Sequence, residues 1–247
     1  ILRSKCGGSL INKQWILTAA HCVDVQYAED RYNSQFPAGS PRIRFDLHNI
    51  SVGLGGATSD ENGIDVIKVS SLTRFDAANA LCHTGYNQTG DLENDIALLK
   101  LDSPVNLASY PNMETALLPA QGTDRLSTNP TNFITKPIGY GKTAYNPTST
   151  QLLEIALTVD QPQTEATRFT AIEANSYGSI CMGDSGGPTH IDLPNRTVIG
   201  LSSYVMGASN TSCNFLDVSS TFTRISAFRS AIDAAVNDCS ANNICFQ

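Results

Sequence analysis

Hydrophobic residues occur along this chain in short runs, and clusters of Gly, Pro, Asn and Ser separate one run from the next. Apolar runs of this length, bounded by turn-forming residues, are typical of β-strands. Clear examples are the segments 15–17, 95–101, 137–141 and 197–201. The pattern therefore predicts an all-β protein, arranged either as one large unit or as two small ones.

Two segments depart from this strand pattern. Apolar side chains recur at three- or four-residue intervals in the segment 227–236, namely at Phe228, Ala231, Ile232 and Ala235. This spacing places them on one face of a helix and predicts a short C-terminal helix. The second segment, the polar stretch 121–131, is the candidate boundary between the two halves of the chain.

The composition narrows the classes of function. The 247 residues include 16 Lys and Arg against 23 Asp and Glu, a net charge of −7, without basic clusters. Nucleic-acid binding requires a basic surface, so we expect no nucleic-acid partner. No apolar run is long enough to cross a bilayer, so we expect no membrane partner either.

The segment Cys-Met-Gly-Asp-Ser-Gly-Gly-Pro at 181–188 is the strongest chemical signal. Its glycines at positions 183, 186 and 187 allow a positive φ and a close approach of the backbone to a ligand. Such a turn can present the Ser185 hydroxyl and point backbone N–H groups at a developing oxyanion. The alternative is a glycine-rich loop that contains a serine by coincidence, and a matching base elsewhere in the chain argues against it.

Two further residues complete a candidate set for nucleophilic catalysis. His21 lies in Thr-Ala-Ala-His-Cys at 18–22, directly after an apolar run. Asp95 begins another apolar run, where a carboxylate is costly to bury unless it has a strong partner such as an imidazole N–H. The remaining histidines are expected to be ordinary surface residues or hydrogen-bonded core residues: His48, His83 and His190.

Five motifs together resemble the chymotrypsin/trypsin type of serine protease, peptidase family S1. In chain order they are 6–11, 15–22, 95–101, 139–141 and 181–188. The order His, Asp, Ser separates this type from α/β-hydrolases and subtilisins. The resemblance begins at about residue 5, so the usual N-terminal strand is missing. It implies an all-β fold of two antiparallel six-stranded β-barrels with a short C-terminal helix, and a catalytic cleft between the barrels.

The resemblance also implies a single serine-protease domain over residues 1–247. The N-terminal barrel would cover about 1–122 and the C-terminal barrel about 123–247. Two disulfides are implied, namely Cys6–Cys22 beside the histidine and Cys181–Cys213 beside the substrate pocket.

Seven cysteines in a chain of this size suggest an oxidising compartment, and therefore secretion. Cys239 and Cys245 could close a small terminal loop, whereas Cys82 could pair with one of them or with a segment outside this sequence. No CxxC or HExxH spacing indicates a metal site, and the expected chemistry needs no cofactor. Some relatives bind calcium in a surface loop, and residues 60–62 offer oxygens, but a solvated turn is the simpler interpretation.

The resemblance assigns a role to each residue of the implied site. Ser185 attacks the peptide carbonyl, His21 accepts and later returns the proton, and Asp95 fixes the imidazole tautomer. The backbone N–H groups of Gly183 and Ser185 would form the oxyanion hole. Activity is then expected to rise with pH as the imidazole loses its proton, at roughly pH 6.5–7.

By the same resemblance, Ser179 lies at the base of the primary pocket, where a trypsin-like enzyme has an aspartate, so cleavage after Lys or Arg is not expected. Ser203, Tyr204 and Val205 replace the family's Ser-Trp-Gly wall segment and are expected to pair with an extended substrate. Val205 and Ser220 add bulk where the family often has glycine, which predicts a preference for small or medium apolar side chains. A chymotrypsin-like preference stays open, because the alignment near Ser220 can shift by one residue.

Activation in this family pairs a newly formed N-terminal amine with the aspartate before the nucleophile, here Asp184. Ile1 has a suitable side chain but lies only five residues before Cys6, where family members have a whole additional strand. Five residues span less than about 20 Å, too short a distance to reach Asp184. We therefore expect further sequence upstream of Ile1, and the partner of Asp184 stays open.

Two functions of different classes remain. The first is a secreted serine endopeptidase, made as a zymogen, with polypeptides as substrates and a protein inhibitor as a further candidate partner. The second is a catalytically silent protease homologue that acts as a binding or regulatory protein. The intact set of His21, Asp95 and Ser185 favours the first, and a monomer is the default expectation.

Overall fold

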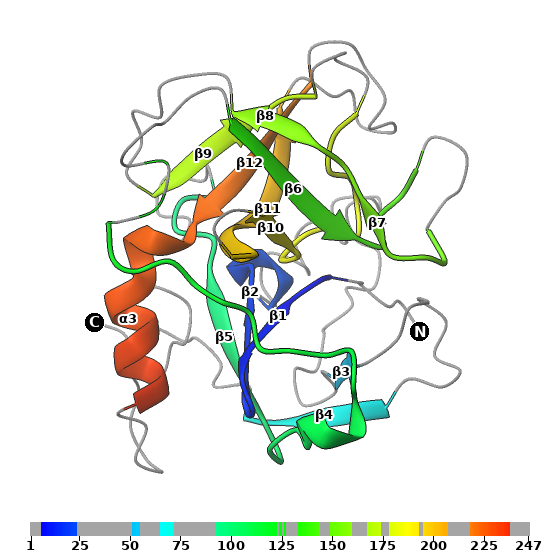
Figure 1. Ribbon diagram of the computed structural model, residues 1–247, viewed down its shortest axis with the longest axis vertical. Coiled ribbons are helices and arrows are strands. Elements are labelled where there is room, and N and C mark those ends of the chain that lie inside the picture. The colour runs from blue at the N-terminus through cyan, green and yellow to red at the C-terminus, as the bar shows by residue number, and fades with distance from the viewer. Residues whose placement is uncertain are drawn as a thin grey trace, which may run out of the picture.

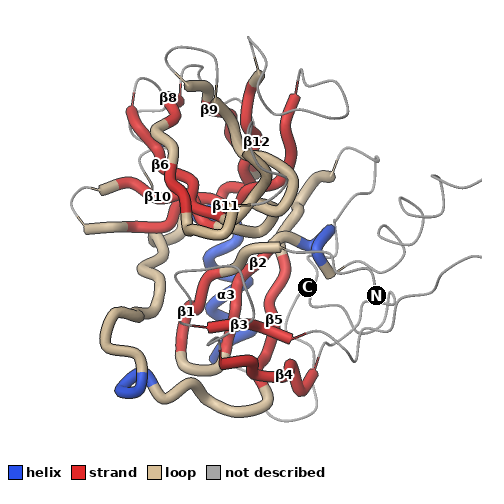
Figure 2. Tube along the Cα trace, turned by 90° about the vertical axis from the view of Figure 1, so that its right-hand side faces the viewer, coloured by secondary structure: helices blue, strands red, loops and turns tan. Residues whose placement is uncertain are grey.

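The computed structural model (Figure 1) describes residues 6–23, 51–54, 65–71, 92–122, 124, 126, 133–143, 149–159, 167–173, 178–192, 195–206 and 218–237. These residues form two antiparallel β-sheets, one from each half of the chain, and a helix near the C-terminus. In Figure 2 the two groups of strands lie one above the other, and Figure 1 shows the C-terminal helix to one side of the lower group. Within the described ranges, no helix is long and apolar enough to cross a membrane.

The first sheet has the strand order β1-β2-β5-β4-β3. Its strands are β1 (Ser9–Asn12), β2 (Trp15–Thr18), β3 (Ser51–Leu54), β4 (Asp65–Ser71) and β5 (Ala97–Leu101). Trp15 and Leu17 pack in an apolar cluster that includes the C-terminal helix, whereas Ile16 packs with the opposite face of the sheet. Burial on both faces explains why this part of β2 is apolar without alternation.

The second sheet has the order β7-β6-β10-β11-β12-β9, and β8 also pairs with β6. Its strands are β6 (Phe133–Gly139), β7 (Leu153–Glu154), β8 (Leu157–Val159), β9 (Arg168–Ala171), β10 (Pro188–Ile191), β11 (Thr197–Met206) and β12 (Ser219–Arg224). Phe169 and Phe222 are central to its core, where their rings stack with centroids 5.2 Å apart.

The expected all-β fold is confirmed, but the strand numbers differ from six and six. Within the described residues the first sheet has five strands and the second has seven, and neither is a continuously closed barrel. β7 and β8 run along the same edge of β6 on either side of Pro137, which has no N–H for the ladder. They therefore act as one interrupted strand, and a bridge between Thr158 and Ile172 joins this edge to the end of β9.

The C-terminal helix α3 (Ile225–Asn237) confirms the helix expected over 227–236. It buries one face, formed by Ile225, Phe228, Ile232 and Ala235, against residues of both sheets. The helix thereby covers the region where the two sheets meet. The division of the chain into barrels near residue 122 stays a prediction.

The expectation that His190 is an ordinary satisfied histidine is wrong. It is 1% exposed on β10, and neither ring nitrogen has a hydrogen-bond partner among the described residues. Its Nε2 lies 3.3 Å from Asp192 Oδ1 and 3.6 Å from Glu154 Oε2. Burial lowers the pKa of His190, as do the charges of Arg196 and Lys136, while the two carboxylates oppose this change.

This histidine predicts an acid-sensitive component of stability. A folded-state pKa below the ordinary value of 6.5 means that the folded protein binds the proton less tightly than the unfolded chain. The contribution of neutral His190 to the free energy of unfolding is therefore complete above about pH 6.5. It is lost as the pH falls through the lowered folded-state pKa. We expect the free energy of unfolding to fall less between pH 7.5 and pH 5 in the His190→Leu variant than in its parent. Urea unfolding measures it, with both proteins in a Ser185→Ala background. Equal losses in the two proteins would contradict this role.

Candidate active site

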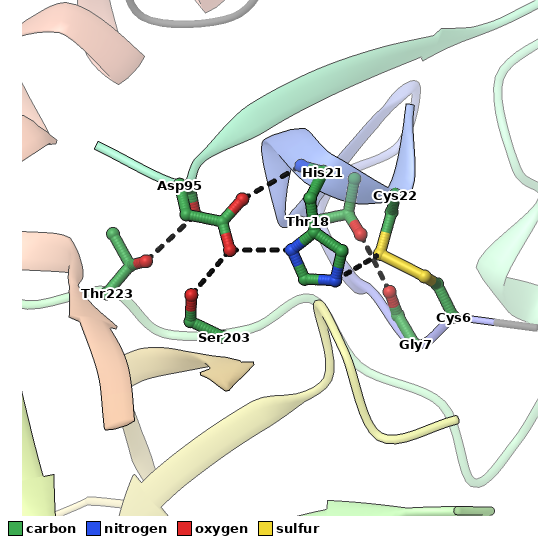
Figure 3. Close-up of polar contacts among 8 residues, drawn as sticks. All are labelled: Cys6, Gly7, Thr18, His21, Cys22, Asp95, Ser203 and Thr223. Atoms are coloured by element: carbon green, nitrogen blue, oxygen red, sulfur yellow. Dashed lines mark hydrogen bonds and ion pairs between the residues drawn. A yellow bond between two sulfur atoms is a disulfide. The ribbon is translucent and has the colours of Figure 1, made fainter. Parts of the chain in front are cut away.

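The side chains of His21 and Asp95 form a direct pair (Figure 3). His21 lies on the short 3-10 helix η1 (Ala20–Cys22) after β2, and Asp95 lies two residues before β5. His21 Nδ1 is 2.7 Å from Asp95 Oδ2, and the His21 backbone N–H donates to Asp95 Oδ1 at 2.8 Å. Asp95 is 1% exposed, whereas the imidazole keeps 11% exposure. One ring nitrogen of His21 is thus held by a buried carboxylate.

A disulfide braces the loop that carries His21. Cys6 and Cys22 are bonded, as expected, and they close a loop with a sequence separation of 16. Cys22 directly follows His21, and its Sγ lies 3.9 Å from His21 Nε2. These three residues are the one group within the described ranges whose ligand atoms lie close enough together for a metal ion. Both sulfurs are consumed in the disulfide, so the group has no thiolate ligands.

Asp95 has two more partners, and both come from the second sheet. Ser203 Oγ on β11 donates to Asp95 Oδ2 at 2.5 Å, and Thr223 Oγ1 on β12 donates to the Asp95 carbonyl at 2.8 Å (Figure 3). From the sequence alone, Ser203 is expected only in the substrate-binding wall, and no motif indicates a role for Thr223. Ser203 and Thr223 are 108 and 128 positions from Asp95 in the sequence, so no local sequence pattern predicts either contact.

Ser185 lies in a turn that packs beside the loop of His21. The Ser185 carbonyl accepts a hydrogen bond from the Gly7 N–H at 2.7 Å, and the Gly7 carbonyl accepts one from Thr18 Oγ1 at 2.8 Å. Gly186 has a φ of 73°, and a Cβ at this position would collide with Thr18 Oγ1. Glycine therefore lets the turn approach the end of β2, three residues before His21.

The turn that precedes Ser185 is also tight. Gly183 has a φ of 103°, and a Cβ there would lie 3.1 Å from the Gly141 Cα. The Asp184 N–H donates to the Cys181 carbonyl at 3.0 Å, which closes the turn. The backbone N–H groups of Gly183 and Ser185 therefore belong to a well-defined turn, and their use as an oxyanion hole stays a prediction.

The Asp184 carboxylate is largely buried and hydrogen-bonded to the backbone. It accepts the N–H groups of Gly141 and Cys181, each at 2.8 Å. Burial raises the pKa of Asp184, and these two hydrogen bonds oppose the rise. Across the described part of the chain, no cationic side chain forms an ion pair with this carboxylate. A cavity of about 280 Å³ lies beside it, lined by β6, β7 and residues 178–180.

The residues predicted for the primary pocket lie near one another. Val205 on β11 and Ser220 on β12 are direct register partners. The buried Ser220 Oγ accepts the Ile180 N–H at 3.1 Å, and Ser179 Oγ donates to the Ile180 carbonyl at 2.9 Å. The fold therefore brings Ser179, Val205 and Ser220 together, while their roles in specificity stay predictions.

The polar side chains of the predicted wall segment have partners within the protein. The Ser203 hydroxyl bonds Asp95, and Arg168 Nη1 donates to the Tyr204 hydroxyl at 3.0 Å. Pairing of this segment with an extended substrate would therefore depend on its backbone, and it stays a prediction.

Several residues for which the sequence gives an expectation lie outside the described residues. They are Ile1, residues 60–62, Cys82, Cys213, Cys239 and Cys245. Cys181 is disulfide-bonded, but its expected partner Cys213 is among these residues.

Comparison with known proteins shows the family to which this chain belongs. The trypsin family model matches residues 1–232. "Chymotrypsin-like elastase family member 1" of Rattus norvegicus is 32% identical over 235 residues, which cover 90% of this chain and 75% of the relative. The Homo sapiens protein of the same name is 32% identical over 243 residues, covering 94% and 81%.

The solved structures agree on the fold. The structure of human heparin binding protein aligns with a TM-score of 0.68 at 22% identity, covering 97% of this chain and 89% of that one. At this identity the similarity shows the fold alone. The family match and the elastase relatives show more: the chain belongs to the trypsin family of serine proteases and is a serine endopeptidase by family.

Proposed function

We propose that this protein is a secreted serine endopeptidase that uses His21, Asp95 and Ser185 as its catalytic triad. The observation that carries the proposal is the 2.7 Å pair between His21 and the buried Asp95, with the glycine-flanked turn of Ser185 packed beside it. Substrates are polypeptides, with small or medium apolar residues preferred before the cleaved bond.

In this mechanism His21 Nε2 takes the proton of Ser185 Oγ as the oxygen attacks the peptide carbonyl. Asp95 holds the proton on Nδ1, so that Nε2 is the basic nitrogen, and it stabilises the imidazolium that forms. The imidazolium then protonates the leaving amine, and water repeats the cycle on the acyl-enzyme. The N–H groups of Gly183 and Ser185 would stabilise the oxyanion.

The proposed specificity rests on the neutral residues of the primary pocket. Ser179 brings no charge to the base, and Val205 opposite Ser220 narrows the walls. A pocket of this kind favours aliphatic side chains of the substrate. Two substrate side chains that differ by one methylene are discriminated by only about 1–3 kcal/mol. The relatives named as elastases support the same preference.

Asp184 is the proposed partner of an N-terminal amine. Its carboxylate is largely buried, with no cationic partner among the described residues, and a cavity lies next to it. An ammonium group there would offset the cost of burying the carboxylate and hold the turn that contains Ser185. Zymogen activation would then consist of supplying that amine.

The alternative function is a silent homologue that binds other molecules without turnover. It is favoured by the fact that no cationic side chain among the described residues pairs with Asp184. The net charge of −7 argues against a polyanion such as heparin, which the name of the similar solved structure mentions. A protein inhibitor remains a proposed partner, and a monomer is the proposed state in solution. The Cys6–Cys22 and Cys181 disulfides support secretion.

The test compares the full-length protein with its Ser185→Ala variant. We expect a fluorophosphonate probe to label the first and not the second, because the probe reacts with an activated serine. On peptides that differ only before the cleaved bond, we expect Ala, Val or Leu to exceed Lys in kcat/KM. No labelling of a folded sample would favour the silent homologue, and best cleavage after Lys would overturn the proposed pocket.

A further inference from the structure

The backbone carbonyl of Asp95 has a hydrogen-bond partner that lies in the other sheet (Figure 3). The carbonyl oxygen of Asp95 accepts a hydrogen bond from Thr223 Oγ1 at 2.8 Å. Thr223 is 3% exposed and lies near the end of β12, whereas Asp95 precedes β5 of the first sheet. The contact therefore crosses the junction between the two halves of the chain.

The backbone at Asp95 is not held by a regular strand. Leu92 and Asn94 have φ values of 55° and 53°, a conformation that non-glycine residues seldom adopt, and the Ile96 N–H bonds the Asn94 carbonyl. Pairing between β5 and β2 begins only at Ala97. The Asp95 carbonyl is thus buried in a tight turn outside the β-ladder, where loss of its partner would be costly.

We propose that Thr223 is a positioning residue for the catalytic aspartate. By fixing the carbonyl of Asp95, it fixes the direction of a carboxylate that binds the backbone N–H and the Nδ1 of His21. Without the hydroxyl, the peptide group would rotate toward another donor and carry the carboxylate out of line with the imidazole. This inference rests on the proposed triad and adds a fourth determinant of its geometry.

The chain offers a matched control on the same strand. Thr221 lies two residues earlier on β12, on the same face, and is 1% exposed. Its Oγ1 has no hydrogen-bond partner among the described residues. Val is nearly isosteric with Thr, so Thr221→Val and Thr223→Val make the same change in side chain at two buried sites, and only the second breaks a hydrogen bond.

The experiment measures kcat and KM for both variants, with the concentration of active sites set by fluorophosphonate titration. We expect Thr223→Val to lower kcat about tenfold with KM unchanged, since the loss affects the transition state rather than substrate binding. Thr223→Ser keeps a hydroxyl and should restore kcat to within about twofold. Thr221→Val should leave both constants unchanged.

Three outcomes would overturn the inference. They are an unchanged kcat in Thr223→Val, an equal fall in kcat for Thr221→Val, or failure of Thr223→Ser to recover activity. A purely structural role would lower the number of titratable sites or the Tm, not kcat per site. Absence of activity in the unmodified protein would instead refute the proposed function, so the two failures are distinguishable.

Discussion

Asp95→Asn is expected to lower kcat by roughly 10⁴-fold while the fold is retained. The carboxylate of Asp95 accepts three hydrogen bonds, from the His21 N–H, His21 Nδ1 and Ser203 Oγ. An asparagine amide has one acceptor and one donor end, so its NH₂ group would face one of these donors or force the imidazole into the wrong tautomer. His21 would then present a protonated Nε2 to Ser185 and could not act as a base.

The matching control is Asp233→Asn. Asp233 is a partly exposed residue of α3 that pairs with Arg229 one turn away, so the same chemical change occurs away from the contacts of Asp95. We expect this variant to keep full kcat, with steady-state kinetics at saturating substrate as the measurement. If Asp95→Asn retained more than about a tenth of the activity, Asp95 would not be the orienting acid.

Asp124→Ala is expected to lower the free energy of unfolding by about 3–5 kcal/mol. Asp124 is 3% exposed and accepts two hydrogen bonds from Arg224, at 2.6 and 2.9 Å, and one from Ser226 Oγ at 2.5 Å. It belongs to the segment between the two sheets, whereas Arg224 ends β12 and Ser226 is the second residue of α3. Removal of the carboxylate leaves a guanidinium largely buried without its counter-charge, which is the costly half of a buried ion pair.

Urea unfolding at pH 7 in a Ser185→Ala background measures this effect without self-digestion. Asp233→Ala breaks a partly exposed pair within α3 and should cost no more than about 0.5 kcal/mol. The double change Asp124→Leu with Arg224→Met should recover part of the loss, because neither partner then remains alone. Equal effects at positions 124 and 233 would show that the buried pair adds nothing beyond a surface one.

The elements of the fold were predictable where the cause is local. The apolar run of β2 indicates a buried strand, and the apolar spacing in α3 indicates a helix with one buried face. The structure contains both elements. The division of one edge strand into β7 and β8 was not predicted, because it occurs on the neighbour of Pro137, 16 or more positions away in the sequence. Strand pairing is a long-range property that hydrophobic periodicity does not encode.

His21 and His190 show the same difference between what local sequence predicts and what long-range packing decides. His21 stood out because its neighbours form a motif with an adjacent cysteine. His190 did not, although it is among the most deeply buried polar residues of the described chain. Its strand β10 lies between β6 and β11, and the sequence near position 190 does not encode this long-range pairing.

By itself, the sequence determined the chemical groups of this protein: a serine between glycines, a histidine next to a cysteine, and an aspartate at the start of an apolar run. These signals are local, because glycine, capping and strand patterns act over a few residues. Only the tertiary structure decided that Asp95 is held at its carboxylate by Ser203 and at its carbonyl by Thr223. Both contacts form when the second sheet packs against the first, and burial at that junction makes each hydrogen bond costly to lose.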